Sequence, residues 1–435
     1  MEHRERIGEG LSAVVVGALV GLAGTVFREA ARRGYELFGE LLGAADVRGI
    51  PGWIAGAFGG AVLVVVSVAL TRRFAGESAG SGIQEVEGIL SGTLPPIRWR
   101  RVLPVKFFGG LLALSAGLLL GREGPTIHMG AGIAQAVAEK SRASRERLHL
   151  LLGAGAAAGL AVAFRAPLAG ILFALEELRR EFPPTRQSIR AVSLATITAV
   201  LVGIALAGPS RILPVPATRY PTALELGLVI PFAMLVGVLG LAFNAALVAT
   251  IERSHAVARR GGALPLALAV GTGIGALAWI APPFTGGGED LAQRMIAAAP
   301  AAGFLAVLLV GRFVLFDVSY ATGVPGGIFA PQLALGACAG ILAVVGGAKL
   351  APTHDFSIVL WSIAGMAALL AATVRAPLTG VALVIEMTGC FPAGLMALIA
   401  AFAADLTART LGGRPIYDSI LDRQLARAKS GSARS

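Results

Sequence analysis

The length, composition and charge of this chain place it in a membrane. It has 435 residues, of which 55% are hydrophobic and only 14% are charged, whereas soluble domains carry about 25% charged residues, so a set of water-soluble domains is excluded. The formal net charge of +11 does not indicate nucleic-acid binding, because Lys and Arg crowd short loops such as 98–101, 140–147 and 179–180, as the positive-inside rule expects.

Long uncharged segments predict helices that cross the lipid bilayer. The first, Leu11–Phe27, is followed by Arg28-Glu29 and not by a small-residue cleavage site, so we interpret it as a membrane helix and not as a signal peptide. Further runs approach or exceed the roughly 20 residues that a helix needs to span the hydrocarbon layer. They are Ile50–Thr71, Ala191–Ser210, Leu226–Ile251 and Phe356–Val374. Because these runs are continuous, they favour helices over a transmembrane barrel.

Glycine-rich segments interrupt the apolar stretches. Gly121–Pro125 and Gly323–Pro331 cannot form regular helix, and Gly80–Gly82 precedes a further apolar run. Broken backbone at membrane depth is tolerated only where it is buried in protein or lines a wet cavity. These breaks are therefore the first candidates for a functional site.

The chain contains an internal repeat. Arg165–Glu177 (RAPLAGILFALEE) is similar to Arg375–Met387 (RAPLTGVALVIEM), at an offset of 210 (375 − 165), and the breaks at Gly121 and Gly323 lie at a similar offset of 202 (323 − 121). Repeated halves with matching helix breaks are typical of transporters whose site lies between the halves. An odd number of crossings in each half would invert one half relative to the other, and this is the arrangement that we expect.

We therefore expect one membrane transport domain over residues 1–435. Its first half covers about 11–205, its second half covers about 220–421, and residues 422–435 form a basic C-terminal tail. We expect no soluble regulatory domain.

The sequence predicts no metal site, cofactor or catalytic group. Cys338 and Cys390 lie in apolar segments and are interpreted as small core residues, and the five histidines are scattered without ligand spacing. There is no His-Glu-x-x-His motif, and no histidine partner is evident for a serine nucleophile. A transporter is therefore expected rather than an intramembrane enzyme.

The helix breaks suit an anion. A bare chloride in hydrocarbon would cost on the order of tens of kcal/mol, whereas free N–H groups and the roughly +0.5 charge at a helix N-terminus supply partial positive charge without trapping the ion. Each break precedes an apolar run that could start a helix, and Pro125 and Pro331 suit a first helical turn.

Three segments, in order along the chain, resemble the signature of the CLC family of chloride channels and proton/chloride exchange transporters. They are Gly80-Ser-Gly-Ile-Gln-Glu85, Gly121-Arg-Glu-Gly-Pro125 and Gly327-Ile-Phe-Ala-Pro331. Arg101–Gly110 and both Arg-Ala-Pro-Leu segments are also similar to bacterial exchanger-like members, and the similarity runs from about Gly80 to Leu421. The resemblance implies an all-α integral membrane protein of CLC-type fold, multi-pass in a bacterial inner (plasma) membrane, with one pathway in each subunit of a homodimer.

The resemblance also implies a chloride-binding site. Ser81 and Tyr417 would bind the central chloride through their hydroxyls, and the backbone N–H groups of Ile328 and Phe329 would complete the site. Outside the resemblance, Ser81 could equally be a helix-packing residue and Tyr417 an ordinary interfacial tyrosine.

Two glutamates would carry protons. Glu123 would be the external gating and proton glutamate, whose ionised carboxylate occupies an anion position; an acid at membrane depth is a functional candidate, and the alternative is a salt bridge to Arg122. Glu177 would be the internal proton-transfer glutamate, and its alternative is a solvated helix end. We interpret Glu386, the repeat equivalent of Glu176, as structural.

This pair of glutamates favours an exchanger whose partners are chloride ions and protons. The alternatives are a passive chloride channel on the same fold and a variant with altered selectivity, such as for fluoride. Gln84 stands where the family commonly has proline, which leaves the anion preference open, whereas Ser81 favours chloride over nitrate by the same resemblance.

Overall fold

The computed structural model describes residues 2–178, 182–350 and 354–432, so Arg179, Arg180 and the last three residues of the expected tail lie outside the described residues. Within these ranges the chain is helical, with isolated backbone bridges and no strand. The helices are α1 (Glu2–Val47), α2 (Gly52–Phe74), η1 (Gly76–Ser78), α3 (Ile83–Leu90), α4 (Trp99–Ser115), α5 (Glu123–Lys140), α6 (Arg145–Phe164), α7 (Pro167–Glu176), α8 (Arg186–Ala207), α9 (Ala223–Arg259), α10 (Ala263–Ile280), η2 (Pro282–Phe284), α11 (Glu289–Ala297), α12 (Ala302–Ala321), α13 (Phe329–Leu350), α14 (Ile358–Val374), α15 (Pro377–Thr388), η3 (Phe391–Ala393), α16 (Gly394–Thr410) and α17 (Ile416–Ser432).

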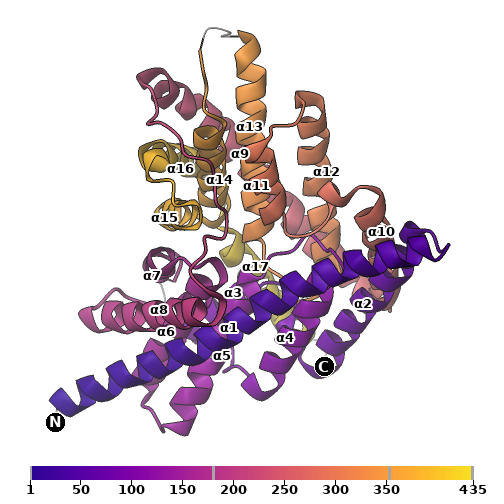
Figure 1. Cartoon of the computed structure of the whole chain (residues 1–435). Coiled ribbons are helices and arrows are strands. Elements are labelled where there is room, and N and C mark those ends of the chain that lie inside the picture. Colours follow the sequence, from indigo (N-terminus) through magenta and orange to yellow (C-terminus); the bar gives the residue numbers. More distant parts are fainter. Residues whose placement is uncertain (1, 179–181, 351–353, 433–435) are drawn as a thin grey trace.

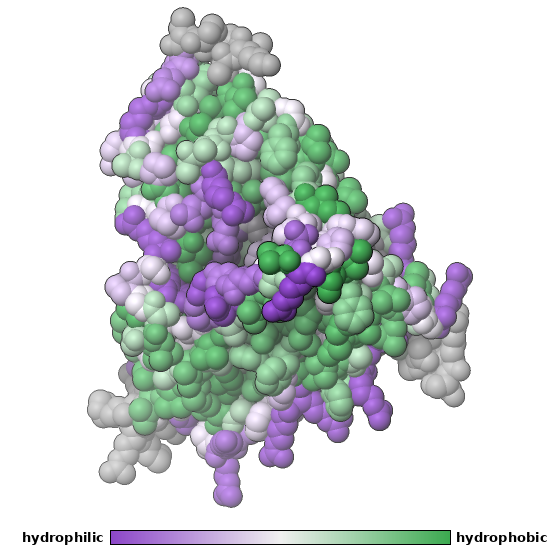
Figure 2. All heavy atoms as spheres, turned by 45° about the vertical axis from the view of Figure 1, so that its right-hand side comes forward, coloured by the Kyte–Doolittle hydropathy of each residue, from purple (hydrophilic) through white to green (hydrophobic). Residues whose placement is uncertain are grey.

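The helices are those of a multi-pass membrane protein. Nine of the described helices are long and apolar enough to cross a bilayer, and they include α1, α2, α8 and α9, which contain most of the uncharged runs. The uncharged run Phe356–Val374 corresponds to α14, which is shorter at 17 residues. Figure 2 shows broad apolar areas on the surface, interrupted at mid-height by a hollow with hydrophilic side chains around it.

The two halves repeat the same packing. In the first half α6 packs against α5, α7 and α8; in the second half α14 packs against α13, α15 and α16. The long helices α1 and α9 occupy matching places, since α1 packs on α6 and α8 while α9 packs on α14 and α16. Figure 1 shows α1 crossing the molecule obliquely and α10 lying beside α2.

The helices α7 and α15 show that the halves are inverted. Glu176, at the end of α7, accepts the Thr379 N–H in the first turn of α15 at 2.6 Å. Glu386, at the end of α15, accepts the Ala169 N–H in the first turn of α7 at 2.8 Å. Each helix therefore ends where the other begins, and repeat-equivalent helices run antiparallel. The structural interpretation of Glu386 agrees with this contact, because a carboxylate stabilises a helix N-terminus.

Close helix crossings depend on glycine at equivalent positions. A Cβ on Gly130 of α5 would overlap the carbonyl of Gly155 of α6, and a Cβ on Gly336 of α13 would overlap the carbonyl of Gly365 of α14. Small residues let membrane helices approach this closely. The two crossings hold α5 and α13, whose first residues belong to the candidate site.

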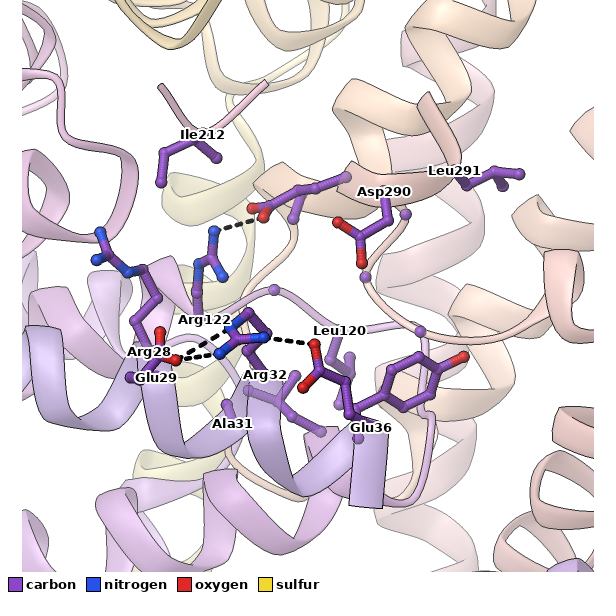
Figure 3. Close-up of a pocket in the computed structure, with 18 of the residues that line it drawn as sticks. Arg28, Glu29, Ala31, Arg32, Glu36, Leu120, Arg122, Ile212, Asp290 and Leu291 are labelled. Carbon is purple, nitrogen blue, oxygen red and sulfur yellow. Dashed lines mark hydrogen bonds and ion pairs between the residues drawn. The ribbon is translucent and has the colours of Figure 1, made fainter. Parts of the chain in front are cut away.

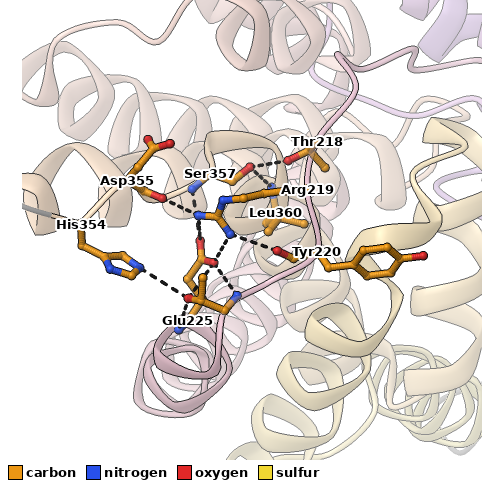
Figure 4. Close-up of polar contacts among 9 residues, drawn as sticks. Thr218, Arg219, Tyr220, Glu225, His354, Asp355, Ser357 and Leu360 are labelled. Carbon is orange, nitrogen blue, oxygen red and sulfur yellow. Dashed lines mark hydrogen bonds and ion pairs between the residues drawn. The ribbon is translucent and has the colours of Figure 1, made fainter.

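A buried carboxylate ties the start of α9 to the start of α14 (Figure 4). Glu225 accepts hydrogen bonds from the Thr222 N–H at 2.9 Å, the Ser357 N–H at 3.2 Å and the Arg219 guanidinium at 2.6 Å. In the other half, Arg147 near the start of α6 donates to the Gly8 carbonyl and to Ser12 of α1. These contacts keep the outer helices in register with the inner ones.

Candidate functional site

The three glycine-rich breaks meet in the interior of the molecule. Gly121 and Gly327 exchange two backbone hydrogen bonds, at 2.9 and 2.7 Å, and form an antiparallel bridge. Gly80 donates to the Val324 carbonyl at 3.1 Å and accepts from Gly326 at 3.0 Å. Segments more than 200 positions apart are thereby joined, and the N-termini of α3, α5 and α13 are brought together.

These N-termini present the positive ends of helix dipoles to one place. Helix α3 begins at Ile83, directly after Gly80–Gly82. Helices α5 and α13 begin at Glu123 and Phe329, so the last three residues of Gly121–Pro125 and of Gly323–Pro331, expected to be non-helical, form first helical turns. The first N–H groups of a helix have no partner within it, so they can bind an anion. The sequence alone did not show whether the breaks lie together. In the fold, the helix N-termini that follow them converge.

Glu123 occupies the meeting point. Its side chain is 0% exposed, and its Oε1 accepts the Phe329 N–H at 2.6 Å. Its Oε2 has no hydrogen-bond partner among the described residues. A Cβ at Gly121 or Gly327 would overlap this carboxylate, so a side chain at either position would displace the carboxylate from this place. The alternative of a salt bridge to Arg122 is not what the structure shows, because Arg122 pairs with Glu289.

Two hydroxyls lie beside this carboxylate. Ser81 and Tyr417 are fully buried, and neither hydroxyl makes a hydrogen bond of regular geometry within the described ranges. The Ser81 side chain is nevertheless close enough to interact with the Tyr417 hydroxyl, and the charge of Glu123 acts on the same hydroxyl. The Tyr417 ring lies 6.3 Å from the Phe329 ring, centroid to centroid. Orphaned buried hydroxyls are costly, so this pair fits a site for a small anion.

The remaining sequence-predicted residues lie close by. Ile328 is buried between Gly327 and the start of α13. Glu177 is partly exposed at the C-terminal end of α7, and its charge reaches the Tyr417 hydroxyl. Gln84 is buried in the first turn of α3, and its Oε1 has no partner among the described residues.

Sequence reasoning missed two buried cations that hold the breaks in place. The Lys106 ammonium, on α4, donates to the Ser78 and Gly80 carbonyls at 3.1 and 2.9 Å. Arg312, at the equivalent place on α12, donates to the carbonyls of three residues in the break before α11 (Pro283, Thr285 and Gly286) at 2.7 to 3.1 Å. Both cations stand inside apolar runs, and that is the signal that could have found them.

A cavity of about 620 Å³, which we call the vestibule, reaches the site from one side (Figure 3). Its lining includes Gly121 and Arg122, the two residues before Glu123, and Gly286–Glu289, the break before α11. The vestibule therefore reaches the backbone at the N-terminus of α5.

Comparisons with known proteins agree with the fold and the motifs. A family model described as voltage gated chloride channel matches residues 62–409. The H(+)/Cl(-) exchange transporter ClcA of Vibrio cholerae serotype O1 (strain M66-2) is 40% identical over 421 residues, which cover 96% of this chain and 90% of that protein. The ClcA exchange transporter of Citrobacter koseri is 40% identical over 432 residues, which cover 97% and 90% of the two chains.

Solved structures extend the comparison to three dimensions. The structure of a slow cyanobacterial Cl-/H+ antiporter superimposes with a TM-score of 0.91 at 34% identity, covering 96% of this chain and 98% of that one. A CLC-type fluoride/proton antiporter superimposes with a TM-score of 0.74 at 20% identity, covering 95% and 97%, and this likeness shows the fold alone. The expected all-α fold with two related halves is confirmed, and the relatives are transporters and not enzymes. The chain belongs to the CLC family, described as voltage-gated chloride channels.

Proposed function

We propose that this protein is a secondary active transporter that exchanges chloride for protons across the membrane. One observation carries the proposal: the buried carboxylate of Glu123 accepts the Phe329 N–H at 2.6 Å where α5 and α13 begin. A carboxylate in that position takes the place of an anion, so its ionisation and halide binding at Phe329 exclude each other. Relatives that are 40% identical to this chain are named proton/chloride exchange transporters, and this supports the same proposal.

The chloride would be bound by hydrogen bonds and dipoles alone. The hydroxyls of Ser81 and Tyr417 would donate to it, and the backbone N–H groups of Ile328 and Phe329 would complete its surroundings. The support is that both hydroxyls are buried and make no hydrogen bond of regular geometry to the described residues. Binding by dipoles, without a direct contact to a fixed cation, leaves the ion free to move on.

Proton transfer to Glu123 would open the pathway. A protonated carboxyl group carries no charge, so it gives up the Phe329 N–H to an incoming chloride and leaves the anion position. When the proton departs, the carboxylate returns and displaces chloride. One site thus binds chloride and ionised Glu123 in alternation, and this links the movement of the two ions.

Glu177 would pass protons between Glu123 and the cytoplasm. It ends α7, whose other end follows Arg165 of the vestibule lining, is partly exposed, and lies within electrostatic reach of the Tyr417 hydroxyl. We propose that the Glu123 side faces outward and the Glu177 side inward, with both termini in the cytoplasm, as the family resemblance implies.

Purified protein in liposomes tests the proposal. An imposed chloride gradient should drive protons uphill in the wild-type protein. In Glu177→Gln, chloride should still move while the coupled proton flux is lost, because only the proton route is interrupted. Chloride movement without protons in the wild type would instead identify a passive channel, and faster fluoride than chloride flux would contradict the chloride assignment.

We propose a homodimer in a bacterial inner membrane, with a complete pathway in each subunit. Every residue of the proposed site comes from one chain, which supports one pathway per subunit, and the exchange transporters matched above are bacterial. Mass measurement of the detergent-solubilised protein tests the stoichiometry: a monomer would contradict the dimer.

A further inference from the structure

The vestibule carries more positive charge than its acids can balance. Six arginines and four acidic residues line it; they are Arg28, Arg32, Arg122, Arg165, Arg211, Arg294, Glu29, Glu36, Glu289 and Asp290. Its volume of about 620 Å³ falls within the roughly 300–1,000 Å³ of small-molecule sites. A halide needs far less space.

Most of the acids are already paired. Arg32 lies between Glu29 and Glu36 and forms ion pairs with both (Figure 3). Glu289 pairs with Arg122. Arg165 instead donates to the Ala207 carbonyl at 3.2 Å and to Ser210, so its charge has no carboxylate partner among the described residues.

Arg28 is also left out of this pairing, and it is the buried arginine of the vestibule lining. It is 5% exposed, and its Nη1 has no hydrogen-bond partner in the described part of the chain. Figure 3 shows it extending into the vestibule from α1 with no contact marked to its guanidinium. The like charges of Arg122 and Arg165 act on it more strongly than the opposite charges of Glu29 and Glu289. A buried charge without a partner is costly, and a bound ligand of opposite charge would offset that cost.

Two neighbouring arginines have N–H groups that make no hydrogen bond to the described residues. The Nε atoms of Arg122 and Arg165 are buried and have no partner within the described residues. Together with Nη1 of Arg28, they provide three unpaired nitrogen donors on side chains that line one cavity. A guanidinium is planar and presents parallel N–H groups that match two oxygens at once. A halide carries one negative charge, whereas Arg28 and Arg165 leave two positive charges without a carboxylate partner among the described residues.

We infer that Arg28, Arg122 and Arg165 form a second anion site, separate from the halide positions at Ser81 and Glu123, which binds a tetrahedral oxyanion of the sulfate or phosphate class. Such an ion carries several acceptor oxygens and about two negative charges at neutral pH, and so compensates more than one arginine. Bound there, it stands over Gly121 and Arg122 and closes the vestibule to chloride. The inhibition rests on the proposed exchange, whereas the binding does not.

Calorimetric titration of the purified protein with sodium sulfate, in sodium chloride buffer, tests the binding. Arg28→Gln should weaken it at least about tenfold, the effect of losing one charge-assisted hydrogen bond. Arg294→Gln is the matched control, because it removes the same charge from an exposed position on the same lining, and it should weaken binding by less than about threefold. Sodium phosphate in a parallel titration separates the two oxyanions.

Several results would overturn the site. They are no sulfate binding to the wild type, equal binding to Arg28→Gln, or chloride competing as a stoichiometric ligand of equal affinity. Should Arg28→Gln fail to fold, Arg28→Lys keeps the charge but loses the planar donor pair, and its sulfate binding should still be weaker than that of the wild type. A structural role for Arg28 alone would leave the sulfate affinity of Arg28→Lys unchanged.

Transport supplies the second measurement. Sulfate added on the vestibule side should inhibit chloride uptake competitively in the wild type and at least about tenfold less potently in Arg28→Gln. Undiminished uptake at saturating sulfate would contradict the block. If no preparation exchanges chloride for protons while sulfate still binds, the proposed function fails and the oxyanion site stands.

Discussion

At the scale of single residues, the site depends on groups left without protein partners. Ser81 and Tyr417 have buried hydroxyls that make no hydrogen bond of regular geometry in the described ranges, and the Glu123 carboxylate has a single backbone donor from another helix. Folding leaves few buried polar groups unpaired. Unpaired buried groups gathered where helix N-termini meet therefore indicate a binding site and not a packed core.

Replacing Ser81 by Ala should weaken chloride binding, because one hydroxyl donor to a charged ligand is lost. The expected cost is about 1.5–3 kcal/mol, or roughly 10- to 150-fold in affinity, measured by calorimetric titration. Ser362→Ala is the control: Ser362 is equally buried, but its hydroxyl is bonded to the Ile358 carbonyl within α14. Equal losses in the two variants would show that Ser81 acts through stability and not through the ion.

Glu123→Gln should remove the pH dependence of chloride movement. In the wild type, lowering the pH protonates Glu123 and frees the Phe329 N–H, so chloride movement should rise as the pH falls. The amide of Gln carries no charge at any pH, so the variant should move chloride at a similar rate across the same range. Chloride efflux from liposomes measures both, and a variant as pH-dependent as the wild type would count against the gate.

The residue types of the site were predictable from the sequence, but their pairing was not. Arg122 is adjacent to Glu123, yet it bonds to Glu289, 167 positions away. Lys106 stands in a segment already noted for its resemblance, but only the fold shows its ammonium bonded to the carbonyls of Ser78 and Gly80. Side-chain partners of this kind depend on tertiary packing and leave no local sequence pattern.

At the scale of helices, the sequence indicated where elements break but not which breaks touch. Glycine and proline predicted the interruptions before Thr126 and Ile328, and the uncharged runs predicted α2, α8 and α9. The internal repeat was detectable in Arg165–Glu177 and Arg375–Met387. These segments contain α7 and α15, which pack on one another and have similar residues there. The break before α11 was not predicted, although Gly286–Gly288 carry the same glycine signal as Gly80–Gly82.

The reciprocal caps of α7 and α15 yield a prediction that separates structure from transport. Glu176→Gln and Glu386→Gln each remove a charge from a helix N-terminus and should cost about 0.5–2 kcal/mol of stability, measured by thermal unfolding in detergent. Proton coupling should survive in both. Glu177→Gln should show the opposite pattern, with stability kept and proton coupling lost. If Glu176→Gln instead lost coupling while Glu177→Gln kept it, the assignment of the two glutamates would be reversed.

At the scale of the whole molecule, the site lies where the inverted halves meet. Gly121–Pro125 of one half and Gly327–Pro331 of the other have the same spacing, an offset of 206 (327 − 121), and their first glycines form the antiparallel bridge. The approximate two-fold axis that relates the halves therefore passes close to Glu123. The same relation places Lys106 and Arg312, also 206 positions apart (312 − 106), on matching carbonyls.

This arrangement explains why the two halves carry different residues at equivalent places. Glu123 and Phe329 are equivalent by the same offset (329 − 123 = 206), and the carboxylate of the first accepts the N–H of the second. A strictly symmetric site would hold two acids or none. With one acid and one backbone donor, a single position can hold either a carboxylate or a halide.

Anomalous diffraction from crystals grown in bromide tests this substitution most directly. In the wild type at neutral pH, bromide should appear beside the Ser81 and Tyr417 hydroxyls and be absent from the Phe329 N–H, where the carboxylate lies. In Glu123→Gln, a further bromide should bind at the Phe329 N–H. Bromide at that N–H in both proteins, or in neither, would contradict the claim that the Glu123 carboxylate takes the halide's place.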